Sequence, residues 1–104
     1  MNKKEGIKLC ESELKVMELL EEGELRAGEI VPILSARVGW NRNTTYTIIK
    51  KCVEKGAIRR IEPKFVCQPL VTKEQTQVYE INALAERLFD GSLEKLRKVV
   101  EEIM

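Results

Sequence analysis

Glycines punctuate the first half of the chain, and the stretches between them constrain the fold more than any other feature of the sequence. Gly23, Gly39 and Gly56 each follow a stretch in which apolar residues recur every three or four positions, which is the repeat of an amphipathic helix. Glycine commonly ends a helix because it enters the left-handed backbone conformation without steric cost. The pattern therefore predicts three helices, over residues 12–22, 28–38 and 43–55.

Local signals refine the ends of these helices. Ser12 is a typical N-cap residue for the first helix, and a polar cluster at residues 41–44 opens the third. Pro32 lies within the second helix but has no backbone N–H to donate. The second helix is therefore expected to begin late or to bend.

Two short β-rich runs follow the third helix, over residues 57–62 and 65–70, and Pro63-Lys64 between them is typical of a tight turn. Three helices followed by a β-hairpin is the order of elements in a winged helix-turn-helix. The sequence therefore predicts a mainly α-helical fold with a small β-hairpin wing. We expect this winged-helix domain to span residues 1–70.

Two further amphipathic helices are expected after the hairpin, over residues 71–104. Thr72 and Gln75 form a capping-box pattern, Gly91 separates the two helices, and Ser92 can cap the second. Each helix carries a narrow apolar stripe that a helical hairpin cannot bury on itself, so a second copy of the chain is the natural cover. The segment is therefore predicted to be a dimerisation region. The stripe residues expected to form the dimer contact are Val78, Ile81, Leu84, Leu88, Leu96 and Val100.

The charge of the chain is distributed unevenly, although its formal net charge is only +1. Residues 11–25 carry six Glu and one Lys, a net charge of −5, whereas residues 41–64 carry seven Lys or Arg and two Glu, a net charge of +5. A basic segment in a nearly neutral protein is a candidate for contact with nucleic acid phosphates. Charged runs are also common on ordinary solvated surfaces, so the charge alone does not decide between the two.

The predicted third helix separates into two faces when its residues are placed about 100° apart. Thr45, Ile48, Ile49 and Cys52 fall on one face, whereas the other is polar in its first two turns. Thr and Asn can hydrogen bond to base edges, and Lys can contact phosphate or guanine, so the polar face suits the major groove of DNA. An ordinary amphipathic surface helix would show the same pattern. The candidate DNA contacts on this helix are Arg42, Asn43, Thr44, Tyr46, Thr47, Lys50 and Lys51.

The predicted wing adds a second basic group. Arg59 and Arg60 on its first strand, with Lys64 at the turn, put positive charge where a wing would meet the DNA backbone or minor groove. The alternative is an edge strand that charge protects against pairing with other strands. Winged helices also serve as protein-interaction modules of the transcription machinery. The polar to basic third helix favours DNA, because an interaction module more often exposes apolar anchors there.

The residues on which enzymes and metal sites depend are scarce. The chain has no histidine, and its three cysteines, Cys10, Cys52 and Cys67, lie far apart, so we expect no zinc site and no other metal or cofactor. It also lacks a glycine-rich phosphate loop and an activated-nucleophile motif, which argues against an enzyme. Cys52 lies among apolar residues and is expected to be a buried, reduced thiol.

Neither membrane insertion nor secretion is indicated. No apolar run approaches the ~20 residues that span a bilayer. Residues 1–5 lead into no stretch that resembles a signal peptide. A cytoplasmic protein is therefore expected.

Five segments carry a likeness to a known family. They are Glu-Leu-Lys-Val-Met at residues 13–17, Trp-Asn-Arg-Asn-Thr-Thr-Tyr-Thr-Ile-Ile-Lys-Lys at 40–51, Glu-Lys-Gly-Ala-Ile at 54–58, Pro-Leu-Val at 69–71 and Leu-Phe-Asp-Gly-Ser at 88–92. Together these segments resemble the penicillinase repressor family of winged-helix transcriptional repressors. The resemblance covers nearly the whole chain, and the combination of segments is more specific than any one of them.

The resemblance implies a homodimer that binds a palindromic promoter operator, with one winged helix on each half-site and C-terminal helices that join the subunits. The family's contacts with double-stranded DNA correspond here to Asn43, Thr44, Tyr46 and Thr47, although many relatives carry Arg at the position of Tyr46. Some relatives are inactivated by a sensor protease that cuts the C-terminal helices, which makes such a protease a candidate partner. The Asn-Phe bond that is cut in those relatives has no counterpart here, so the inducing signal stays open.

Overall fold

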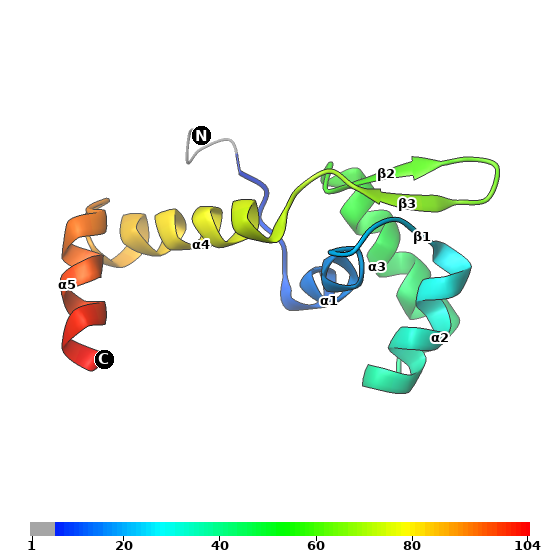
Figure 1. Cartoon of the computed structure of the whole chain (residues 1–104), viewed down its shortest axis with the longest axis horizontal. Coiled ribbons are helices and arrows are strands. Elements are labelled where there is room, and N and C mark those ends of the chain that lie inside the picture. Colours follow the sequence, from blue (N-terminus) through cyan, green and yellow to red (C-terminus); the bar gives the residue numbers. More distant parts are fainter. Residues whose placement is uncertain (1–5) are drawn as a thin grey trace. The chain divides into compact units, whose positions relative to one another are not determined.

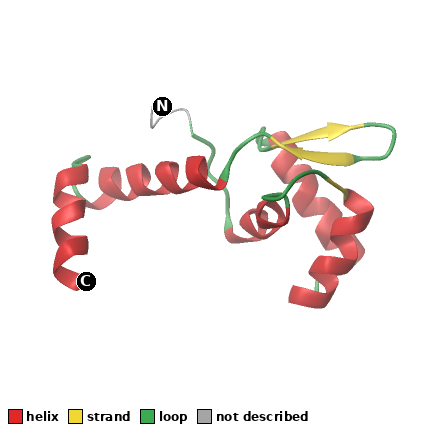
Figure 2. Ribbon diagram, viewed as in Figure 1, coloured by secondary structure: helices red, strands yellow, loops and turns green. Residues whose placement is uncertain are grey.

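The computed structural model describes residues 6–104, which form five helices and three short strands (Figure 1, Figure 2). The first five residues of the expected winged-helix domain, which also bear on the signal-peptide prediction, lie outside the described residues. The chain divides into two compact units, residues 9–73 and residues 74–104 with the segment 6–8. Along the chain the elements are α1 (Glu11–Leu19), β1 (Leu25–Arg26), α2 (Ala27–Val38), α3 (Arg42–Glu54), β2 (Ile58–Ile61), β3 (Val66–Pro69), α4 (Lys73–Leu88) and α5 (Leu93–Ile103).

The core of the first unit forms where α1 and α2 pack against α3. The buried apolar residues recur at helical spacing, and they include Val16, Leu20, Ile30, Leu34, Ile49 and Cys52. Full burial of a Val, Leu or Ile side chain stabilises a fold by ~1.5–3 kcal/mol, so this small set holds the three helices together. Three helices followed by a hairpin confirm the predicted winged-helix order.

The start of α1 differs from the prediction. The helix begins at Glu11 with Cys10 as its N-cap residue, and Ser12 lies inside the first turn. The cause is Glu13, whose carboxylate accepts the Cys10 N–H at 2.8 Å and so satisfies a backbone group at the start of the helix. The predicted cap at Ser12 is therefore wrong. The helix also ends at Leu19, before the turn that leads to Gly23.

The second helix begins early rather than late. Arg26 is its N-cap residue, and the Glu29 carboxylate accepts the Arg26 N–H at 3.0 Å. Pro32 lies inside the helix, where its missing N–H leaves the carbonyl of Gly28 without its usual partner. Gly28 is exposed in the first turn, where water can reach that carbonyl. Gly39, in the left-handed conformation at φ 73°, ends the helix as predicted.

The sheet contains a strand that the sequence analysis missed. β1 pairs with β3, and β3 pairs with β2, so the strands lie in the order β1-β3-β2 and every pair is antiparallel. Leu25 lies opposite Cys67, and Ile61 lies opposite Val66 at the turn end of the hairpin. A strand of two residues is too short to show an alternating pattern. The predicted two-stranded wing is therefore anchored at its inner edge by a third strand.

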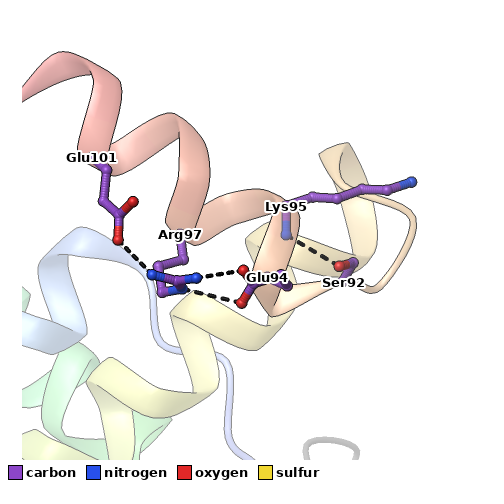
Figure 3. Close-up of polar contacts among 5 residues, drawn as sticks. All are labelled: Ser92, Glu94, Lys95, Arg97 and Glu101. Atoms are coloured by element: carbon purple, nitrogen blue, oxygen red, sulfur yellow. Dashed lines mark hydrogen bonds and ion pairs between the residues drawn. The ribbon is translucent and has the colours of Figure 1, made fainter.

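The second unit contains α4 and α5, separated by a turn at residues 89–92. Gly91 adopts φ 76° in this turn, and the Ser92 hydroxyl accepts the Lys95 N–H at 3.1 Å, which confirms the predicted break and cap. On the polar side of α5, the Arg97 guanidinium binds the carboxylates of Glu94 and Glu101 (Figure 3). These contacts link successive turns of α5.

Candidate nucleic-acid interface

The start of α3 is fixed by a side-chain cap. The Asn41 side-chain oxygen accepts the Thr44 N–H at 2.8 Å, and the helix then begins at Arg42, one residue earlier than predicted. This bond satisfies one of the four N–H groups that have no partner within a helix at its first turn. The cap therefore fixes where α3 begins.

The two faces of α3 lie as the helical period predicts. Thr45, Ile49 and Cys52 are fully buried, and the Thr45 hydroxyl donates to the Asn41 carbonyl at 3.2 Å. Ile48 is half-buried. The predicted contact residues lie on the opposite side: Arg42, Asn43, Thr47, Lys50 and Lys51 are exposed, and Thr44 and Tyr46 are half-buried.

Two cysteines are buried in the core of the first unit, Cys52 on α3 and Cys67 on β3. Burial raises the pKa of the Cys52 thiol to about 12 and that of the Cys67 thiol to about 11. Both thiols are therefore protonated and neutral near pH 7, which suits residues that only pack. Cys52 is a buried, free thiol as expected, whereas Cys10 is exposed.

An ion pair joins the C-terminal end of α3 to α1. Lys55 Nζ lies 2.6 Å from Glu13 Oε1, and the Glu13 side chain is only 1% exposed. Burial opposes the charge of Glu13, but hydrogen bonds from Lys55 and from the Cys10 N–H outweigh it and hold the pKa of Glu13 below its ordinary value. The hydrogen bond with Glu13 in turn raises the pKa of Lys55. Lys55 therefore pairs with a buried carboxylate, although it belongs to the basic segment at residues 41–64.

The wing separates two arginines that the sequence had grouped together. Neighbouring residues of a strand point to opposite faces, and Arg60 lies opposite buried Cys67, so Arg60 is on the inner face of the sheet and Arg59 on the outer face. Arg60 also binds both carboxylate oxygens of Glu62 at 3.2 Å. Lys64 is exposed in the turn at residues 62–65.

An aromatic contact joins the wing to α3. The rings of Tyr46 and Phe65 meet edge to face, with centroids 5.7 Å apart and an angle of 67° between their planes. The guanidinium carbon of Arg42 lies 5.0 Å from the Tyr46 ring centroid, and that of Arg60 lies 3.8 Å from the Phe65 ring centroid. Phe65 was not singled out from the sequence. The signal that could have found it is a bulky aromatic residue placed directly after the Pro63-Lys64 turn.

The described residues lack the features of two other classes of site. Across residues 6–104, no group of three Cys, Asp or Glu side chains is arranged to hold a metal ion. Within the same described range, no helix is both long and apolar enough to cross a membrane.

Comparison with known proteins bears on both units. The family profile described as penicillinase repressor matches residues 9–103. The chain has no match among curated proteins. The matched range includes the three helices, the wing and both helices that follow. Because this match spans well over half of the sequence, the chain belongs to the penicillinase repressor family, whose members are winged-helix DNA-binding transcriptional repressors.

Proposed function

We propose that this protein represses transcription as a homodimer that binds a palindromic promoter operator. In this proposal α3 of each subunit lies in the major groove, and the wing contacts the DNA backbone. The observation that carries the proposal is the division of α3 into a core face and an exposed polar face. Thr45, Ile49 and Cys52 fix the orientation of the helix, while Asn43 and Thr47 are left on the outside.

Base recognition is assigned to the first two turns of α3. In helix-turn-helix proteins the N-terminal part of the recognition helix meets the base edges. Asn43, Thr44 and Thr47 present short polar groups that can accept or donate at those edges, and threonine methyls can contact thymine methyls. Tyr46 belongs to the same predicted set, but its hydroxyl accepts a 3.4 Å hydrogen bond from Arg42 and its ring contacts Phe65.

Phosphate contact is assigned to the long cationic side chains. Lys50, Lys51, Arg59 and Lys64 are all exposed, and none of them forms an ion pair among those described for residues 6–104. Arg42 lies at the positive end of the helix dipole, where an anion is favoured. Phosphate contacts set the register of a protein on DNA, and base contacts then discriminate between sequences.

Dimerisation is assigned to residues 71–104. Val78, Ile81 and Leu88 on α4 follow a spacing of three and seven residues and are all exposed, with Leu88 65% exposed and Ile81 48% exposed. Val100 on α5 is also exposed, whereas Leu84 and Leu96 are half-buried. Apolar stripes at this spacing are typical of helices that pack on a partner. A two-fold dimer would match the two-fold symmetry of a palindrome.

Selection of bound sequences from a random duplex library by the full chain tests this proposal. We expect one enriched motif with two inverted half-sites whose centres lie about 10 base pairs, or a multiple of that, apart. Lys98→Ala, a change on an exposed residue of α5, serves as a control and should enrich the same motif. Absence of any enriched motif, or a motif without inverted repeats, would contradict the proposal.

A further inference from the structure

Four side chains form a continuous series from the first turn of α3 to the wing. The guanidinium of Arg42 lies over Tyr46, Tyr46 meets Phe65 edge to face, and the guanidinium of Arg60 lies over Phe65. We call these residues the Arg-aromatic ladder: Arg42, Tyr46, Phe65 and Arg60. Its two ends are cations, and its two middle members come from different elements of the fold.

Phe65 is the member that connects the wing to the rest of the first unit. Its backbone adopts φ 51°, in the left-handed region that residues other than glycine seldom occupy. Its carbonyl accepts the Ala27 N–H at 3.0 Å, at the first turn of α2. Phe65 therefore contacts α2 through its carbonyl and α3 through its ring. A strained backbone held in this way points to a role for the side chain that it positions.

The wing needs such a connection because it is small. β2 and β3 have four residues each, and β1 adds only two. A hairpin of this length is marginally stable unless it packs on something else. If the wing moved freely against α3, its ordering would oppose DNA binding, whereas a wing already held in place avoids that cost.

We propose that Tyr46 and Phe65 are positioning residues that lock the wing to the recognition helix, so that Arg42 and Arg60 meet the DNA backbone at a set spacing. The inference rests on the proposed function, because it explains how that DNA-binding surface is organised before binding. It assigns to Tyr46 a structural contact through its ring rather than the reading of a base through its hydroxyl.

The chemistry of the two cations fits this role. A guanidinium that stacks on a ring keeps its N–H groups at its edges, where they can bind phosphate oxygens in a forked arrangement. Arg60 uses Nε and Nη2 to bind Glu62. A guanidinium carries five N–H donors in all, so the Nη1 side of Arg60 is available for a phosphate while Glu62 holds the group in place.

The test compares binding to the duplex enriched by the full chain with binding to a scrambled duplex, over a range of salt concentrations. We expect Phe65→Ala and Tyr46→Ala each to weaken binding to the enriched duplex roughly tenfold, the factor expected for the loss of one partly desolvated cation–π contact. Each should also lower the salt dependence, because the arginines no longer meet phosphates together. The double variant should bind no more weakly than either single variant. Tyr46→Phe, which keeps the ring, should recover most of the affinity.

Thermal unfolding of each variant separates positioning from stability, because a purely structural role shifts the melting temperature and leaves the salt dependence of the folded protein unchanged. If Phe65→Ala does not fold, Phe65→Leu carries the test, since it keeps apolar volume but offers no ring to Arg60. Additive losses, or Tyr46→Phe as weak as Tyr46→Ala, would overturn the inference and leave the proposed function intact. If the full chain enriches no duplex at all, the proposed function falls, and the inference with it.

Discussion

Thr45 and Thr47 are identical residues two positions apart on α3, and the helix gives them opposite surroundings. Thr45 is fully buried and its hydroxyl donates a hydrogen bond to the Asn41 carbonyl, whereas Thr47 is exposed on the polar face. The same substitution at the two positions therefore separates an effect on folding from an effect on recognition.

We predict that Thr47→Ala weakens binding to the enriched duplex by ~1–3 kcal/mol, the usual range for one base contact, with little change on scrambled DNA. Thr45→Ala should instead lower the free energy of unfolding by about 1 kcal/mol, because a buried hydrogen bond is lost. The ratio of specific to non-specific affinity should then stay near that of the unchanged protein. Binding isotherms on both duplexes, together with urea unfolding, check the pair. An unchanged ratio in Thr47→Ala would place the recognition surface elsewhere.

Glu13 provides a second prediction at this scale. Its pKa lies below the ordinary value of 4.5 in the folded protein, so its contribution to stability is present above about pH 4.5 and is lost as the pH falls through the lower, folded-state pKa. Glu13→Gln should lower the free energy of unfolding by ~1–3 kcal/mol near pH 7, because it removes the negative charge that pairs with Lys55, although the amide oxygen can still accept a hydrogen bond. The difference between the two proteins should shrink as the pH is lowered below 4.5. A difference that is independent of pH would contradict the assignment.

The sequence predicted the positions of single residues correctly where the helical repeat determines which side chains are buried. The helical repeat placed Thr45 and Cys52 inside and Thr47 outside, as the structure has them. It failed at Ser12, because the glutamate that binds the N-cap backbone is Glu13, three residues after Cys10, and this glutamate is held in place by Lys55 of a distant segment. The contact with Lys55, 42 residues away, leaves no local trace in the sequence.

At the scale of elements, the recognition helix and the wing act as one surface in the proposed function. The sequence predicted both elements from apolar spacing, turn residues and glycines. It did not predict β1, which has two residues, or the contact between Tyr46 and Phe65. That contact joins segments 19 residues apart in the sequence, and the hairpin that carries Phe65 is also bonded to β1 and to Ala27.

The exposed cations of these two elements give the prediction at this scale. Lys50→Ala, Lys51→Ala and Lys64→Ala should each weaken binding to enriched and scrambled duplexes alike. Each should also lower the slope of log affinity against log salt by about one per subunit, since one phosphate contact and its released counterion are lost. Lys98→Ala on α5 removes the same charge from a surface outside the proposed interface and should leave the slope unchanged. An unaltered slope in the triple lysine variant would contradict the assignment.

At the scale of the whole molecule, the proposed function makes affinity depend on joining two winged helices. A single subunit offers one recognition helix of 13 residues and a short wing, which in the proposed function together cover one half-site. Linking two such modules can raise affinity 10²–10⁴-fold without any new contact, provided that both half-sites are engaged at once. The apolar stripes of α4 and α5 were predictable because their spacing is helical, whereas the geometry of the proposed dimer is not encoded in any local pattern.

The last prediction concerns these stripes. Ile81→Glu combined with Val100→Glu should convert the dimer to a monomer. Both positions are exposed and apolar, and the new carboxylates would lose their water in the dimer contact. Lys98→Glu adds negative charge on the face of α5 away from Leu96 and Val100, and it should leave the dimer intact. Sedimentation at micromolar concentration measures the mass of each variant directly. Binding to the enriched duplex should fall at least a hundredfold in the Ile81→Glu/Val100→Glu variant. Lys98→Glu should sediment and bind as a dimer. A monomeric full-length chain at that concentration would contradict the assignment of residues 71–104 to dimerisation, whatever the DNA measurements show.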